Sequence, residues 1–403
     1  MQPRLSQRAQ AMPASPIRKL APAAEAAKRR GIHVYHLNIG QPDVETPRPF
    51  LEKLAQIHDR VLAYSPSDGT PEFLATLLGY YAKLGIELSR ADLLVTTGGS
   101  EACLFAMLAC ANQGDDALVM EPYYSNYAAF GLIAGVRLVP LTTRGEDGFH
   151  VPPREDWEKA LTPRTKLVLL CNPNNPTGTV YSREELLPIA EFCREHGLFL
   201  VSDEVYREFV YDGERAVSAL ELPGYEDLVV VADSLSKRYS ACGIRLGALV
   251  TRNHDVREAC LRMAQARLCA PGLAQMIACG ADELPPEYSA DYVAAFRRRR
   301  DILYDGLSAI PGVMLRKPEG AFYLMPRLPV DDAEDFARWL LEEFDFEGGT
   351  VMIAPAEGFY ATPGLGQNEA RIAYVLNEED LRRSVKILER GLEAYQNRTR
   401  AAS

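Results

Sequence analysis

From residue 92 to residue 251, short apolar runs alternate with longer segments of helical periodicity. We expect strands at residues 92–97, 117–121, 137–141, 166–171, 198–203, 228–233 and 246–251, with helices at 100–111, 124–134 and 182–196. Strands that are apolar throughout and separated by helices indicate a mostly parallel sheet covered on both faces. Such sheets bind ligands beyond the carboxyl ends of their strands, so polar residues that directly follow a strand are the first candidates for a site.

Outside this region the pattern is that of a smaller α+β arrangement. We expect helices at 17–30, 50–58, 272–282, 288–309, 333–344 and 378–395, and strands at 34–37, 313–316, 322–325, 350–354 and 372–374. A chain of 403 residues is long enough for more than one core. We therefore predict an N-terminal arm that completes a small domain (residues 1–48), a large domain (49–286) and a small C-terminal domain (287–403).

Composition excludes several classes of partner. The net charge is −11, which disfavours nucleic acid, and the arginine run at 297–300 is best interpreted as a solvated helix face. The eight cysteines include no C-x-x-C pair, which is typical of reduced thiols and predicts neither disulfides nor a metal site. No apolar stretch approaches the roughly 20 residues that span a membrane, and residues 1–14 lack the apolar core of a signal peptide. We predict a cytoplasmic protein.

Lys237 follows one of the predicted strands, in the segment Ser-Leu-Ser-Lys-Arg-Tyr-Ser-Ala-Cys-Gly-Ile-Arg-Leu-Gly that spans residues 234–247. Two hydroxyls and an arginine in one loop suit a phosphate dianion. A lysine beside them is of the kind that forms a Schiff base. Pyridoxal 5′-phosphate (PLP) needs this combination from a protein. For Lys237 alone, however, a solvated basic loop is the better interpretation.

Three other loops follow predicted strands. Residues 96–102, Thr-Thr-Gly-Gly-Ser-Glu-Ala, form either an anion site at a helix N-terminus or an ordinary tight turn, but not a nucleotide fingerprint. Residues 172–178, Asn-Pro-Asn-Asn-Pro-Thr-Gly, form a stiff loop that presents amides. Asp203 ends an apolar strand and needs a cationic partner, unless it caps the next helix. Either Tyr123 or Tyr124 stacks on a flat cofactor ring, or both only pack against other residues of the protein.

Together, these loops resemble the class I and II aminotransferases of PLP fold type I, most closely the bacterial aspartate and aromatic aminotransferases. Asn-Pro-x-Asn-Pro-Thr-Gly, Asp-Glu-x-Tyr and Ser-x-Ser-Lys with Gly-x-Arg-x-Gly occur in the family's order, over nearly the whole chain. The resemblance implies a large domain with a mostly parallel seven-stranded sheet between helices, and a smaller α+β domain.

The resemblance also implies a role for each matching residue. Lys237 would bind PLP covalently and then carry a proton, Asp203 would pair with the ring nitrogen, and Tyr206 with Asn175 would bind the ring hydroxyl. The remaining cofactor contacts would come from the backbone of Gly99, Ser100 and Glu101, and from the side chains of Tyr124, Ser234, Ser236 and Arg245. The carboxylate of Glu101 would then have to point away from the phosphate.

Three further positions match substrate or partner contacts of the family. Gly40 and Arg371, with Asn175, would bind the substrate carboxylate. Tyr64 would reach the phosphate of the neighbouring subunit, which implies a homodimer with active sites at its interface. Gln41 departs from the family's usual glutamate in the loop around Gly40.

The implied reaction is a ping-pong transamination from an L-amino acid to a 2-oxo acid such as 2-oxoglutarate. Aspartate is the first candidate donor, and broad or aromatic specificity is an alternative. A second carboxylate needs a second cation, for which Arg18 and Arg267 are unsupported candidates. Alternatives are a C–S β-lyase or a kynurenine-type transaminase on the same fold, and a non-catalytic PLP-binding regulator. A nicotinamide-dependent oxidoreductase is a further alternative, but the sequence lacks the glycine fingerprint of a dinucleotide site.

Overall fold

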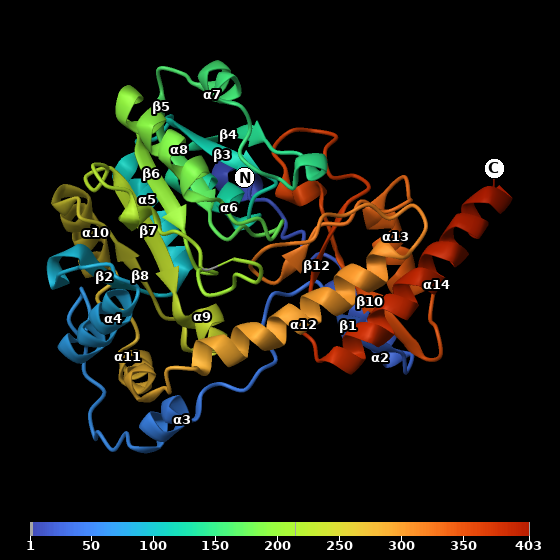
Figure 1. The fold of residues 1–403 in the computed structure, drawn as a ribbon, viewed down its shortest axis with the longest axis horizontal. Helices are drawn as coiled ribbons and strands as arrows, with labels where there is room; N and C mark the ends of the chain where they lie inside the picture. The colour runs from blue at the N-terminus through green and yellow to red at the C-terminus, as the bar shows by residue number, and fades with distance from the viewer. Residues whose placement is uncertain (1–2, 214, 403) are drawn as a thin grey trace.

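A seven-stranded sheet is the largest element of the structure, a computed structural model that describes residues 3–213 and 215–402 (Figure 1). Its strands are β2 (Leu93–Thr96), β3 (Asp116–Glu121), β4 (Arg137–Thr142), β5 (Thr165–Cys171), β6 (Phe199–Asp203), β7 (Val229–Ser234) and β8 (Gly247–Val250). They lie in the order β2-β8-β7-β6-β5-β3-β4. Neighbouring strands run parallel except β8, which is antiparallel to both β2 and β7. The predicted fold class is confirmed.

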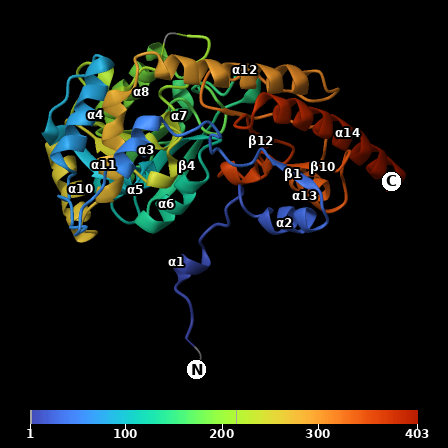
Figure 2. The same ribbon diagram turned by 90° about the horizontal axis from the view of Figure 1, so that it is seen from below.

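Alternate residues of each strand enter two separate hydrophobic cores. In β5, Leu167 and Leu169 belong to the core that includes α5 (Gly99–Cys110), α6 (Asn126–Ala134) and α10 (His254–Ala266). Val168 and Leu170 belong to the opposite core, with α4 (Pro71–Lys83), α8 (Arg183–His196) and α11 (Gly272–Ala278). The strands are apolar throughout because both faces are covered, as the turned view shows (Figure 2).

Local signals determine where the helices begin and end. Ser182 caps the first turn of α8 in a reciprocal capping box with Glu185, and Gly197 ends that helix in the left-handed conformation. Thr70 caps α4 and Pro71 is its first residue. Helices α4, α7 (Arg154–Ala160) and α10 were not expected from the sequence. α7 has only seven residues, whereas α4 and α10 have 13 each.

Two smaller sheets stand beside the large one. In one of them β1 (His33–His36) runs parallel to β10 (Gly349–Met352), so the N-terminal segment completes the C-terminal region. The other has the antiparallel order β11-β12-β9. It consists of β9 (Tyr323–Leu324), β11 (Ala354–Pro355) and β12 (Ala370–Ala373). The remaining helices are α1 (Gln7–Gln10), α2 (Ala21–Arg29), α3 (Arg48–Ala55), α9 (Leu235–Arg238), α12 (Tyr288–Ser308), α13 (Ala333–Glu342) and α14 (Glu378–Ala402).

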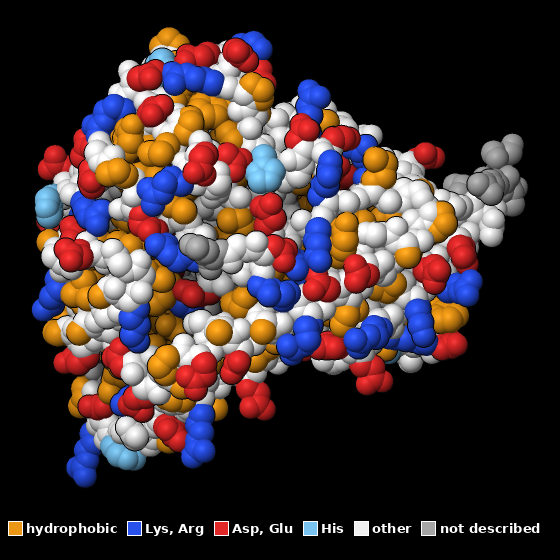
Figure 3. All heavy atoms as spheres, viewed as in Figure 1, with side chains coloured by type: hydrophobic (Ala, Val, Ile, Leu, Met, Phe, Trp, Pro, Cys, Tyr) orange, Lys and Arg blue, Asp and Glu red, His pale blue; other side chains and the backbone are white. Residues whose placement is uncertain are grey.

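Two predictions for the C-terminal region are wrong. Residues 313–316 form no strand; Met314 makes only an isolated bridge with Arg327. The arginine run in α12 is not uniformly solvated. Arg298 does pair with Glu378 at the surface. Basic and acidic side chains lie next to each other at many places on this face of the molecule (Figure 3). Arg300, however, is only 1% exposed. Its guanidinium binds the carboxylate of Asp212 and the carbonyl of Pro318, which compensate its charge.

No helix within residues 3–213 and 215–402 combines the length and the apolar character needed to cross a bilayer.

Candidate active site

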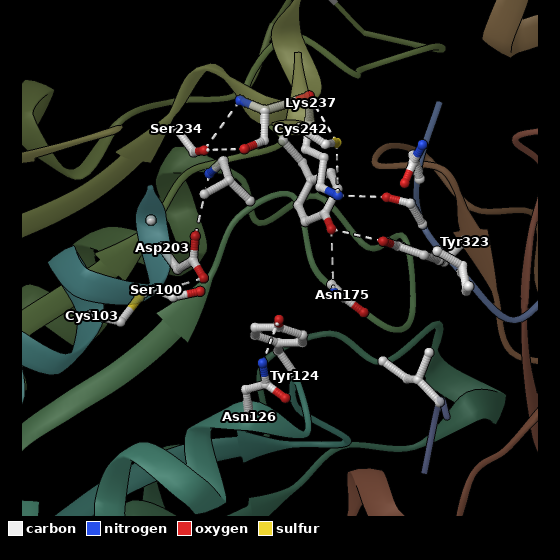
Figure 4. Close-up of a pocket in the computed structure, with 18 of the residues that line it drawn as sticks. Ser100, Cys103, Tyr124, Asn126, Asn175, Asp203, Ser234, Lys237, Cys242 and Tyr323 are labelled. Carbon is white, nitrogen blue, oxygen red and sulfur yellow. Dashed lines mark hydrogen bonds between the residues drawn. The ribbon is translucent and has the colours of Figure 1, made fainter. Parts of the chain in front are cut away.

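One cavity of about 660 Å³ opens at the carboxyl ends of β5, β6 and β7 (Figure 4). Pairing places these strand ends together, because Cys171 lies opposite Asp203, and Asp203 opposite Ala232. The predicted site residues that line the cavity are Gly40, Gly99, Ser100, Tyr124, Asn175, Asp203, Tyr206, Ser234, Ser236, Lys237, Arg245 and Arg371. Two predicted residues, Glu101 and Tyr64, do not line it.

Lys237 projects into the cavity from α9, which starts at the end of β7. Its Nζ donates to the carbonyl of Gly40 at 2.5 Å and lies 3.9 Å from the sulfur of Cys242. From the other side, the hydroxyl of Tyr292 donates to the Lys237 carbonyl at 3.0 Å and holds its backbone. No carboxylate of the described chain pairs with Nζ. Lys237 is half-buried, and no carboxylate holds its amine, so the amine can react with a ligand in the cavity.

An anion site lies beside the lysine. The hydroxyl of Ser234 donates to that of Ser236 at 3.0 Å, and Nη1 of Arg245 donates to the same Ser236 oxygen at 3.3 Å. The other nitrogen of the guanidinium lies so close to Gly98 that a Cβ there would meet it at 2.6 Å. α5 begins at this point and directs its N-terminus toward the site. Two hydroxyls, a guanidinium and a helix N-terminus are the groups that bind a phosphate.

Glu101 is turned away from this anion site, as predicted. Its carboxylate accepts from the backbone N–H of Thr97 at 2.8 Å and from Nε of Arg267 at 3.0 and 3.1 Å. Arg267 also donates to the carbonyl of Val95 and does not line the cavity. It is therefore not available as the second cation of this cavity.

Asp203 ends β6 and is buried. Its Oδ2 accepts from the hydroxyl of Tyr127 at 2.6 Å and lies 3.7 Å from the sulfur of Cys103, while the N–H of Val205 reaches Oδ1 at 3.3 Å. Burial raises the pKa of this carboxyl to about 6, although the Tyr127 hydrogen bond partly opposes the rise. None of the described cationic side chains pairs with it. A cationic group in the cavity would supply the missing partner.

Arg371 is a second buried charge with unused capacity, and it is 1% exposed. Its Nη1 donates to Oδ1 of Asn175 at 2.9 Å, and its Nη2 donates to the carbonyl of Asn38 at 2.6 Å. The guanidinium stacks on the ring of Tyr323, 4.3 Å from its centroid. Its buried Nε has no hydrogen-bond partner. No described carboxylate neutralises this guanidinium, so the cavity is suited to a carboxylate ligand.

A row of hydroxyls connects Asn175 to the far wall. Nδ2 of Asn175 donates to the hydroxyl of Tyr206 at 3.3 Å, and this hydroxyl is 2.8 Å from that of Tyr323 (Figure 4). Burial raises the pKa of Tyr206 well above its ordinary value. Tyr206 therefore stays protonated and can donate to an oxygen in the cavity.

Tyr124 and Tyr64 lie in contrasting places. The ring of Tyr124 forms a wall of the cavity, and its hydroxyl accepts from Nδ2 of Asn126 at 2.7 Å. Tyr123, the other candidate, is buried in the core. Tyr64 is 79% exposed and does not line the cavity.

Sequence reasoning missed five residues of the site. They are Asn38, Cys103, Tyr127, Tyr292 and Tyr323. Cys103, Tyr127, Tyr292 and Tyr323 stand outside the Gly- and Pro-rich loops, and Asn38 lies two residues before Gly40. All five touch the site only through the fold. No local pattern could have found them.

Comparison with known proteins agrees with this geometry. Residues 32–388 match the family model described as aminotransferase class I and II. Aspartate aminotransferase of Geobacillus stearothermophilus is 30% identical, covering 97% of this chain and 99% of its own. A probable aspartate/prephenate aminotransferase of Aquifex aeolicus is 31% identical over 96% of this chain and 98% of its own. Among solved structures, aspartate aminotransferase from Thermotoga maritima superimposes with a TM-score of 0.88 at 28% identity, covering 96% of this chain and 100% of its own. The chain belongs to the family of class I and II aminotransferases.

Proposed function

We propose that this chain is a PLP-dependent aminotransferase that moves the amino group of an L-amino acid to a 2-oxo acid in two ping-pong half-reactions. Aspartate is the first candidate donor and 2-oxoglutarate the first candidate acceptor, in line with the names of the relatives. One observation carries the proposal: a single cavity joins a reactive lysine, an anion site, a carboxylate without a cation and a buried arginine without a carboxylate.

The residues present fit PLP. Ser234, Ser236, Arg245 and the first turn of α5 would hold its phosphate. Asp203, which lacks a cationic partner in the described chain, would pair with the ring nitrogen. When bound, PLP supplies an electron sink that stabilises negative charge at the substrate Cα.

Asp203 and the Asn175–Tyr206 pair would set the charge of the site. A cation beside Asp203 lowers the pKa of the carboxyl again, so the buried carboxylate and its partner would both stay charged at neutral pH. The Tyr206 hydroxyl and the Asn175 amide would donate to the ring oxygen. Tyr124 would cover one face of the ring by offset stacking.

Lys237 and Arg371 would act on the substrate. Nζ of Lys237 would carry the cofactor and, once the substrate amine has released it, take and return the proton of the substrate Cα. Arg371 would bind the substrate carboxylate through its free N–H groups and so place Cα near Nζ. The carbonyl of Gly40, which holds Nζ at 2.5 Å, would keep the amine on the substrate side.

A homodimer is part of the proposal. The face formed by α3, α11 and the loop between α3 and α4 carries exposed large apolar side chains: Leu51, Leu54, Val61, Leu62, Tyr64, Leu268 and Met276. Ser67 ties this loop to Leu268 through a hydrogen bond of 2.5 Å. Contiguous exposed apolar surface suits association with a second copy, which would bring Tyr64 to the partner's phosphate.

Subunit mixing tests this arrangement. Homodimers of Lys237→Ala and of Tyr64→Ala should both be impaired. A hybrid of the two contains one site with both defects and one intact site, so mixing should restore activity. An absence of restoration, with hybrids verified by native mass spectrometry, contradicts a shared site.

The predicted domain limits and location are retained as proposals. Division after residues 48 and 286 is supported by β1, which pairs only with the C-terminal strand β10, and by α12, which leads away from the large sheet (Figure 1). A reducing cytoplasm suits eight free cysteines.

Visible absorbance of the purified protein, titrated with a panel of amino acids, tests the function. Each good donor should convert the band of the lysine-bound cofactor to that of its amine form, and a 2-oxo acid should restore it. Pyruvate with ammonia or sulfide as the products would instead identify a C–S β-lyase. A protein that neither binds PLP nor responds to any donor would refute the proposal.

A further inference from the structure

The charges that line the cavity do not balance once the proposed contacts are made. Among the described lining residues, four are cationic (Arg18, Lys237, Arg245 and Arg371) and Asp203 alone is acidic. Arg245 faces the phosphate, Lys237 carries the cofactor and Arg371 meets the substrate carboxylate in the proposed function. Arg18 remains without an anion.

The backbone around Arg18 is held in place. The N–H groups of Arg18 and Lys19 both donate to the carbonyl of Ser15, at 3.1 and 3.0 Å. Nδ2 of Asn38 donates to the carbonyl of Ile17 at 2.7 Å, and the ammonium of Lys19 pairs with Glu334. Residues 15–19 therefore form a turn anchored on both sides of Arg18, with Arg18 at the cavity rim.

The anchor on one side leads directly to the carboxylate-binding arginine. Asn38 binds Ile17 with its side chain and accepts from Arg371 with its carbonyl, at 2.6 Å. The rim that carries Arg18 is thereby held in register with Arg371. A cation at the cavity rim and a second one inside the cavity suit a ligand with two anionic ends.

The guanidinium of Arg18 has no partner of its own. It makes no hydrogen bond or ion pair with the part of the chain that the structure describes, whereas Arg267, the other candidate, is bound by Glu101. The rest of the rim offers uncharged groups only: Ser15, Gln41 and Asn126 are polar, and Ile17, Ile39 and Phe130 are apolar. These side chains can contact the carbon chain of a substrate but cannot neutralise a charge.

We propose that Arg18 is the specificity-determining residue for the substrate side chain, which it binds through an anionic end group. The substrate class is then L-amino acids with an acidic side chain, together with the matching 2-oxo diacids. This inference rests on the proposed function. One residue serves both half-reactions, because donor and acceptor occupy the same cavity in turn.

Steady-state kinetics with paired donors test the inference. In the wild type, kcat/KM for aspartate should exceed that for alanine. Arg18→Gln should lower the ratio of the two kcat/KM values about tenfold, a modest factor because the rim is solvated and the pair is partly screened. Arg18→Lys should recover part of the ratio. Lys28→Gln removes the same charge from α2, away from the cavity, and should leave the ratio unchanged.

Equilibrium binding supplies a readout that needs no turnover. Calorimetric titration of the PLP-loaded protein with succinate, a dicarboxylate, and with butyrate, a monocarboxylate of the same length, gives two dissociation constants. Arg18→Gln should weaken succinate binding about tenfold more than butyrate binding, and added salt should act in the same direction.

The outcomes separate this inference from the proposed function. If alanine converts the cofactor band and aspartate does not, Arg18 has no such role but the aminotransferase proposal stands. An acidic preference that survives Arg18→Gln also overturns the assignment, because another cation must then supply it. If no amino acid converts the band, the proposed function itself fails.

Discussion

Asp203 and Asp233 are both buried near the carboxyl ends of neighbouring strands, β6 and β7, yet their pKa values shift in opposite directions. Burial raises the pKa of Asp203 to about 6. Burial also acts to raise the pKa of Asp233, but Arg238 and Arg207 outweigh it and hold that pKa below its ordinary value. The same residue type in the same kind of place has two cationic neighbours in one case and none within the described chain in the other.

The surroundings of Asp233 are complete within the chain. Nη2 of Arg238 donates to both carboxylate oxygens at 3.0 Å, and the hydroxyl of Tyr81 donates to Oδ2 at 2.9 Å. Arg207 stands 3.6 Å away and is bound in turn by Glu204. The guanidinium of Arg238 also lies 3.7 Å from the centroid of the Tyr80 ring. The charges of this cluster are matched within the chain, and none of its residues lines the cavity.

Lys237 and Arg238 are adjacent in α9, but their side chains point to different places. Arg238 turns inward to Asp233, whereas Lys237 lines the cavity with Asp203. Charges matched inside the chain are structural, and charges left unmatched toward a cavity indicate a ligand. In this enzyme the distinction identifies the site more sharply than burial does.

Lys237→Ala should cause the largest loss. Removal of the amine that carries the cofactor and moves the Cα proton should lower kcat by at least about 10⁴-fold. The melting temperature should change little, because Nζ makes few contacts. Single-turnover absorbance with the best donor measures the loss; wild-type kinetics in this variant would contradict the mechanism.

Arg238→Met should instead damage the fold. It leaves the Asp233 carboxylate buried with only the more distant Arg207, and breaking such a pair costs about 3–5 kcal/mol. Urea unfolding at matched protein concentration measures the difference. The double variant Asp233→Asn/Arg238→Met removes both charges and should recover part of the stability. A neutral outcome for the single variant would mean that the cluster contributes nothing to folding.

Asp203→Asn should stabilise the cofactor-free protein at neutral pH while reducing activity. A pKa raised from 3.8 to about 6 means that the folded state binds the extra proton, so wild-type stability falls as pH rises from about 4 to 6. Above pH 6 the variant should gain at most about 3 kcal/mol, and near pH 4 nothing.

Asp233→Asn is the matched control for Asp203→Asn. The lowered pKa of Asp233 adds stability that is present above its ordinary pKa and lost in acid, so this variant should be destabilised at neutral pH. Thermal unfolding of both variants and the wild type from pH 4 to pH 8 shows whether each substitution raises or lowers the stability. If both substitutions changed the stability in the same direction at neutral pH, the contrast between the two aspartates would be wrong.

The smallest effect should come from the tyrosines that donate to each carboxylate. Tyr127→Phe removes a hydrogen bond of 2.6 Å that favours the charged form of Asp203, so the stability transition should move to higher pH. The expected change is about 1 kcal/mol. Tyr81→Phe removes the corresponding bond to Asp233, where two guanidinium groups remain, and should shift its transition less.

Much of the large sheet was predictable because its strands are buried on both faces and so are apolar throughout. The short edge elements were not. The segment around Met314 looks like a strand but makes only one bridge, since no neighbouring strand extends beside it. Helix α4 was missed, although Phe73, Leu77 and Tyr81 repeat at helical spacing and Thr70 caps its start. The buried Arg300 was misread because Asp212, its partner, is 88 residues away.

The candidate site also contains some residues that could be predicted from the sequence and others that could not. Lys237, Asp203 and Asn175 lie at or just after strand ends, in segments whose composition is unusual, so their positions could be predicted. Tyr323 lines the cavity, and Asn38 binds Arg371, only because distant elements pack together. Sequence also could not distinguish Arg18 from Arg267, because the difference lies in which of them already has a partner.

The hydrogen bond between Arg371 and the carbonyl of Asn38 has a consequence for how the protein is made. Its two residues are 333 positions apart. During synthesis, Asn38 can therefore bind Arg371 only after nearly the whole chain has left the ribosome. The cofactor side, built from residues 99–245, is complete much earlier. Contacts of such long sequence separation form late in folding. A newly made chain should therefore gain the ability to hold PLP before it gains the ability to select a substrate.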